Sequence, residues 1–141
     1  MRSWNDYVKD GTIRKTMPNK GRIKTLINMA NVRIDVISKI KIDEQNASVI
    51  FTNYYDSLRE ICEAVALLNG YKIYFHEATG LFLKEILNEE SFFARFDKYR
   101  TMRNGVHYYG TPVPFAESVQ CINNMLEIIE KLKIKYLEEF I

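Results

Sequence analysis

One stretch in the second half of the chain carries polar side chains at the spacing of a single helical face. At about 100° per residue, five of them fall within about 60° of the same direction: Asp97, Arg100, Arg103, Asn104 and His107. Apolar residues gather on another face, and we expect Tyr109, which is among them, to lie in the core. This helix therefore combines a core face with a face that bears two guanidinium groups, an amide and an imidazole.

These side-chain types suit the cleavage of an RNA phosphodiester. Arginine offers forked donors that match phosphate oxygens, so Arg100 and Arg103 could hold the phosphate and stabilise charge in the transition state. Histidine exchanges a proton near neutral pH, so His107 could act as the general acid or base. This chemistry needs no metal, and we expect no cofactor. The substrate-binding candidates on the same helix are Asp97, Asn104 and Tyr108.

Two alternatives stay open for this segment. Polar stripes on helices are usually solvated faces, and a simple solvated face is one reading of this stripe. Tyr108 could stack on a base, or it could be a rim residue of a dimer interface.

The only other histidine, His76, precedes Glu77 at a helix start, and we interpret it as a structural residue that serves the first backbone amides.

The elements that must position these residues all have helical periodicity. We predict helices from 19 to about 40, from 43 to 70, from 76 to 87, from about 90 to 109, and from 115 to near the end. Asn19 and Asp43 are suitable N-caps, and Gly70 fits the left-handed position that ends many helices. Residues 71–75 form a short link. Residues 1–18 form an arm held by its aromatic side chains, and residues 19–141 form a single all-α domain, an antiparallel bundle of about five helices.

Composition narrows the class of protein. The chain has 141 residues and a net charge of +2, so any contact with nucleic acid must be local rather than spread over the surface. Cys62 and Cys121 lie inside apolar helical patterns, which predicts two buried free thiols. No stretch approaches the roughly 18 apolar residues of a membrane span, so we expect a cytoplasmic protein with no membrane partner.

Three stretches together resemble the HEPN family, the higher-eukaryote-and-prokaryote nucleotide-binding domains, and in particular its small stand-alone prokaryotic members. They run from Tyr54 to Tyr71, from Phe75 to Leu83 and from Tyr99 to Gly110. With helix order and length, the likeness covers nearly the whole chain. The family motif is an arginine, four to six residues, then a histidine. Arg100 and His107 fit it with six residues between them, whereas Arg103-Asn104 resembles the arginine-plus-polar pair at a shorter spacing.

The resemblance implies a helical bundle that forms a two-fold homodimer, with the motifs of both subunits facing each other across a cleft. Active members are metal-independent endoribonucleases, often toxins neutralised by a small nucleotidyltransferase. Other members bind nucleotides or RNA without cutting. We therefore expect an RNA-cleaving or RNA-binding protein, and the alternative is a catalytically inactive nucleotide-binding or interaction module.

Overall fold

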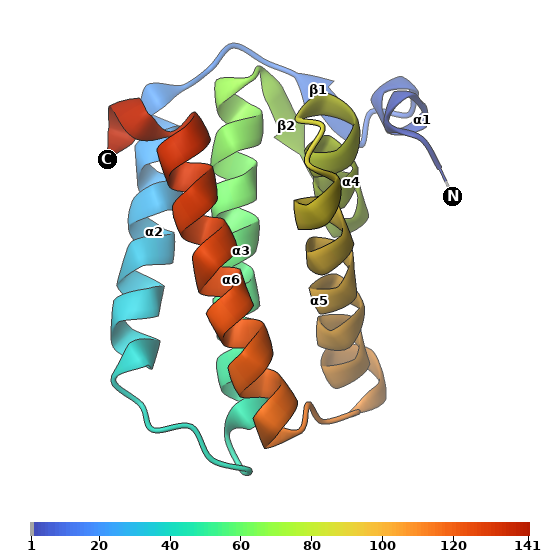
Figure 1. The fold of residues 1–141 in the computed structure, drawn as a ribbon. Helices are drawn as coiled ribbons and strands as arrows, with labels where there is room; N and C mark the ends of the chain where they lie inside the picture. Colours follow the sequence, from blue (N-terminus) through green and yellow to red (C-terminus); the bar gives the residue numbers. More distant parts are fainter. Residues whose placement is uncertain (1) are drawn as a thin grey trace.

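The computed structural model describes residues 2–141, and helices dominate it (Figure 1). The all-α class is confirmed, with one very small sheet added. In chain order the elements are α1 (Trp4–Lys9), β1 (Ile13–Lys15), α2 (Lys20–Ser38), α3 (Ala47–Leu68), β2 (Tyr71–Ile73), α4 (His76–Leu81), the π-helical turn η1 (Phe82–Ile86), α5 (Glu90–Tyr109), α6 (Phe115–Tyr136) and the 3-10 turn η2 (Glu138–Phe140).

Helix α3 is the central rod of the bundle. It contacts α2, α5 and α6 along its length, and Figure 1 shows it enclosed by these helices. A helix with neighbours on several sides must be apolar around most of its circumference. The sequence of α3 meets that requirement, since buried residues occur on nearly every turn from Ala47 to Leu67. The predicted long second helix is therefore confirmed in its place and its role.

The ends of the helices test the predicted capping residues. The Asn19 side chain accepts a hydrogen bond from the Arg22 amide and caps α2, as predicted. Gly70 takes a φ of +86° directly after α3, also as predicted. The prediction that Asp43 caps α3 is wrong. Asp43 instead accepts hydrogen bonds from the Gln45 and Asn46 amides in a turn that precedes the helix, so α3 begins at Ala47.

The N-terminal arm is more ordered than the sequence suggested, and Met1 lies outside the described residues. Trp4 and Tyr7 are buried, and the Trp4 ring lies edge-on to Tyr71 with ring centroids 5.1 Å apart. The prediction that aromatic side chains hold the arm is confirmed. However, the arm also contains helix α1 and strand β1, which a pattern search over so few residues does not detect.

Strands β1 and β2 form an antiparallel pair in which Ile13 lies opposite Ile73 and Arg14 lies opposite Lys72. The segment predicted as a plain link is thus partly a strand. Since side chains alternate across a strand, the isoleucine pair and the cation pair lie on opposite faces. Ile13 is buried in the core while Arg14 and Lys72 are exposed. The sheet therefore joins the arm to the bundle and presents two cations outward.

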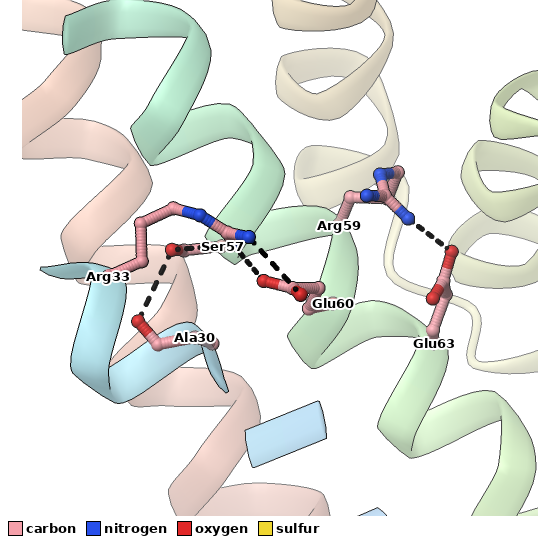
Figure 2. Close-up of polar contacts among 6 residues, drawn as sticks. All are labelled: Ala30, Arg33, Ser57, Arg59, Glu60 and Glu63. Carbon is pink, nitrogen blue, oxygen red and sulfur yellow. Dashed lines mark hydrogen bonds and ion pairs between the residues drawn. The ribbon is translucent and has the colours of Figure 1, made fainter. Parts of the chain in front are cut away.

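A buried polar network fixes α2 against α3 (Figure 2). Arg33 of α2 forms an ion pair with Glu60 of α3, whose side chain is only 5% exposed. Arg33 also donates to the Ser57 hydroxyl, and that hydroxyl donates to the carbonyl of Ala30. Because each group in this chain of contacts has a partner, the network is compatible with a buried interface between two helices.

The described residues also test two predictions from composition. Cys62 and Cys121 are both buried and free, as predicted. Between residues 2 and 141 no helix combines the length and the apolarity needed to cross a membrane.

Prediction for the buried ion pair. Arg33→Met leaves the Glu60 carboxylate buried without a partner, so we expect it to lower the free energy of unfolding by about 3 kcal/mol. Glu60→Met should cost less, because the Arg33 side chain is 24% exposed and can reach water. The double variant should recover most of the loss. Urea unfolding followed by circular dichroism measures all three.

The control is Lys39→Met, which removes the exposed ion pair of Lys39 with Asp35 and should change the free energy of unfolding by about 0.5 kcal/mol or less. Equal losses in Arg33→Met and Lys39→Met would contradict the importance of burial at this pair.

Candidate functional site

The rotation of α5 about its own axis is set by two buried aromatic rings. Phe96 packs on Tyr55 of α3, with ring centroids 5.5 Å apart, and Tyr99 packs edge-on against Phe51 of the same helix. Gly80 of α4 lets the two helices approach closely, because a Cβ at this position would lie 3.4 Å from a ring carbon of Phe96. With these contacts made, α5 has little freedom to turn.

Arg100 and Arg103 of the polar stripe lie beside the start of α4 rather than in open solvent, whereas His107 of the same stripe is exposed. On the same helical projection Phe93 and Phe96 fall within about 40° of Arg100, so the stripe begins as an aromatic face and becomes polar one turn later. The two phenylalanines pack beside Gly80, and Arg100 and Arg103 follow in line. The side chains of both arginines are therefore half-buried, and the alternative of a simple solvated face does not describe them.

A cavity of about 390 Å³ lies where the start of α4 meets the middle of α5. We call it the His76 cavity. Its lining is Tyr74, Phe75, His76, Glu77, Arg100, Arg103, Asn104 and Tyr108. Of the six candidate residues found in the sequence, four meet here, and they are Arg100, Arg103, Asn104 and Tyr108.

The two arginines of the cavity differ in their partners. Arg100 donates from Nε and Nη2 to the same oxygen of Asp97, at 3.1 and 2.9 Å. Asp97 is therefore the residue that orients Arg100, and it does not line the cavity itself. Arg103 forms no ion pair with any residue from 2 to 141, and its Nε is buried without a hydrogen-bond partner among them. One cationic fork thus remains available to an anion.

A third arginine acts on the cavity without lining it. Arg59 of α3 forms an ion pair with Glu63 at 2.6 Å, and Figure 2 shows the two side chains facing each other. Its Nε, like that of Arg103, is buried and has no hydrogen-bond partner among residues 2–141. The positive charge of Arg59 reaches His76 and Tyr55, where it acts together with Arg100 and Arg103 on the titration of both groups.

His76 is the functional candidate that the sequence interpretation missed. It does not serve backbone amides at the start of α4; its Nδ1 lies 3.3 Å from the hydroxyl oxygen of Tyr55. Burial, and after it the nearby charges of Arg59, Arg103 and Arg100, together lower the pKa of His76 to about 4. The ring is therefore neutral at neutral pH and can accept a proton. The sequence did contain one indication of this site. Phe96 falls on the same helical face as Arg100, and an apolar residue at that position indicates that this face packs against another element.

His107 lies apart from this group. It is exposed and does not line the His76 cavity. Its neighbour Tyr108 does line the cavity. The prediction that Tyr109 lies in the core is wrong, because its side chain is 82% exposed, next to Tyr108 at 71%. Helical periodicity alone does not show at which residue the packing of a helix against the core ends.

The fold and the site define an all-α bundle with a half-buried, arginine-lined cavity beside a neutral histidine. In residues 2–141 no cluster of three His, Cys, Asp or Glu side chains is placed to hold a metal ion. Comparisons with protein-family models, with curated proteins and with solved structures found no match to this chain.

Prediction for His76. The unfolded chain binds a proton at histidine near the ordinary pKa of 6.5, whereas folded His76 binds one only near pH 4. Between these values the unfolded state holds more protons, so stability falls as the pH is lowered from 6.5 toward 4. We expect His76→Gln to lose part of this pH dependence. Urea unfolding at pH 7 and at pH 5 measures the difference.

The matched control is His107→Gln, which removes the other imidazole from an exposed position. An unchanged difference between pH 7 and pH 5 in His76→Gln would show that His76 is not held neutral by its surroundings.

Proposed function

We propose that this chain is an RNA-binding protein of the HEPN type that cleaves RNA without a metal, using the His76 cavity to hold a phosphate of the strand. The observation that carries the proposal is the half-buried Arg103 guanidinium. It lines the cavity, forms no ion pair within residues 2–141, and has a buried Nε without a partner. A buried cation without a counter-ion is unfavourable, and a bound phosphate would supply the missing negative charge.

The other residues of the cavity support the same ligand. Arg100 is oriented by Asp97, so its remaining N–H groups can donate to a second phosphate oxygen. Asn104 and Tyr108 contribute an amide and an aromatic ring to the same lining. An exposed tyrosine beside a cationic cavity offers a surface on which a base can stack.

The chemistry follows from the neutral state of His76. When Nδ1 carries the proton and donates it to the Tyr55 oxygen, Nε2 is left as an acceptor, which is the tautomer a general base needs. The base takes the proton of a ribose 2′-hydroxyl, and the 2′ oxygen bonds to phosphorus as the bond to the 5′ oxygen breaks. A second proton goes to the leaving 5′ oxygen. We propose His107 as its donor, because His107 precedes Tyr108 at the edge of the cavity, although it does not line the cavity itself. The products are a 2′,3′-cyclic phosphate and a 5′-hydroxyl.

A second candidate function is nucleotide or RNA binding without turnover. The position of His107 favours it, because the histidine of the expected motif is exposed and stands outside the cavity lining. In that case the arginines bind the phosphate as described and no acid completes the reaction.

We also propose that the chain works as a homodimer and that a small nucleotidyltransferase is its partner. Both proposals rest on the family resemblance, which places the motifs of two subunits on either side of one cleft. The neighbouring exposed rings of Tyr108 and Tyr109 at the end of α5 would be covered by such an arrangement. Light scattering coupled to size-exclusion chromatography tests the dimer, and a monomer at all concentrations would contradict it.

Prediction for phosphate binding. Arg103→Met removes the unpaired fork, so we expect it to weaken the binding of a single-stranded RNA about 10- to 100-fold. Arg95→Met is the matched control, since it removes the same side chain from a position about 80° around α5 from Arg103 that does not line the cavity. Fluorescence anisotropy with a labelled RNA measures both. Equal losses of RNA affinity in the two variants would show that Arg103 acts only through the net charge of the protein.

Prediction for cleavage. In the presence of a chelator, the wild type should cut RNA and leave cyclic phosphate ends, and His76→Ala and His107→Ala should each slow the reaction by about 10²- to 10⁴-fold. Electrophoresis and analysis of the product ends measure this. If the wild type binds RNA but leaves it intact, the second candidate function stands. If it binds neither RNA nor a mononucleotide, both functions are wrong.

A further inference from the structure

A second and larger hollow adjoins the His76 cavity. It measures about 730 Å³ and is lined by six residues of the N-terminal arm between Arg2 and Arg14, together with Tyr74 and Phe75. We call it the arm depression. Because Tyr74 and Phe75 also line the His76 cavity, the two hollows meet at these rings. Both side chains are about half exposed.

The small sheet places two cations close to the Tyr74 ring. The guanidinium carbon of Arg14 lies 5.6 Å from the ring centroid, and the Lys72 ammonium lies 5.3 Å from it. Lys72 and Tyr74 are two residues apart and so share a face, and Arg14 is the cross-strand partner of Lys72.

This arrangement is unfavourable for the protein alone. Like charges directly opposite each other on neighbouring strands destabilise the pair. Neither Arg14 nor Lys72 forms an ion pair with any other residue of the described chain, 2–141. The one carboxylate of the arm depression, Asp10, is already held by Arg2 at 2.5 Å. Hydrogen bonds from Thr12, and to a smaller extent the Arg2 contact, lower the pKa of Asp10 to about 2.

The cations and the exposed ring fit the chemistry of a nucleotide. Aromatic rings stack on bases of any sequence, while neighbouring arginine and lysine side chains bind the phosphates of a single strand. A phosphate would supply Arg14 and its cross-strand neighbour Lys72 with a counter-ion, and a base would cover the half-exposed ring of Tyr74.

We propose that the arm depression is a second nucleotide subsite, continuous with the His76 cavity, in which a base stacks on Tyr74 and its phosphate binds Arg14. Lys72 does not line the depression, but it lies across the strand pair from Arg14 and adds a second positive charge beside the Tyr74 ring. This inference rests on the proposed function, because it extends the strand held at Arg103 by one nucleotide. The N-terminal arm thus makes affinity depend on the length of the strand, while the His76 cavity holds one phosphate.

The experiment measures affinity against strand length. The probes are uridine monophosphate and 2′-O-methyl oligouridylates of two to eight nucleotides, which lack the 2′-hydroxyl needed for cleavage, in competition with a labelled strand. In the wild type, affinity should rise steeply between one and three nucleotides. Arg14→Met and Tyr74→Ala should each lower the affinity for the octamer about tenfold. Arg14→Met should leave uridine monophosphate binding unchanged and reduce the salt slope for the octamer by about 0.7.

Two further variants sharpen the result. Tyr74→Phe keeps the ring and should keep the wild-type affinity. Lys15→Met removes an exposed cation from the position next to Arg14 that lines neither hollow, and it should have little effect.

The outcomes separate the two proposals. If Arg103→Met weakens every probe while Arg14→Met and Tyr74→Ala behave like Lys15→Met, the second subsite is wrong and the proposed function stands. If the wild type binds none of the probes, the proposed function fails and the second subsite fails with it.

Discussion

The packing of Phe96 on Tyr55 is the contact on which the geometry of the site depends. Successive side chains of a helix are fixed at about 100° to one another, so fixing one ring fixes the direction of all the others. With Phe96 held between α3 and α4, Arg100 and Arg103 must face the start of α4 one and two turns later. Tyr55 supports the site twice, because its ring holds Phe96 and its hydroxyl holds His76. A core contact and a polar contact of one side chain therefore set the two walls of the cavity relative to each other.

Charge is distributed unevenly around that contact. Glu63 forms an ion pair with Arg59 on α3, and Asp97 forms one with Arg100 on α5. These contacts fix the positions of two guanidinium groups, but the positive charges of both arginines still act on His76. The net charge of +2 hides this local imbalance. An imidazole surrounded by three arginines stays neutral, and a neutral imidazole can sit beside a phosphate and still accept a proton. Burial and charge thus act on His76 in the same direction.

The sequence predicted those parts of the structure that depend on local patterns. The periodicity of α3, the cap at Asn19 and the left-handed Gly70 each follow from neighbouring residues, and all three are present. The β1–β2 pair joins residues almost sixty positions apart, and three-residue strands carry no periodic signal. The contact of His76 could not be predicted for a related reason, since Tyr55 and the arginines that act on His76 come from other helices. The helical projection did contain a usable clue, because Phe93 and Phe96 share the stripe of Arg100. The family resemblance and the dimer remain predictions.

The way the N-terminal arm is attached has a consequence for dynamics. The arm is joined to the bundle by three paired residues on each strand and by three further hydrogen bonds. These run from the Thr16 amide to the Gly70 carbonyl, from the Tyr74 amide to the Thr12 carbonyl, and from the Trp4 amide to the Glu85 carboxylate. A segment with so few protected backbone hydrogen bonds opens at a lower free energy than the core helices, which open only with the whole fold. Amide hydrogens of the strand pair should therefore exchange with solvent faster than those of α3. The two hollows that meet at Tyr74 consequently belong to regions of different local stability, and the arm side is the one that can open while the bundle remains folded.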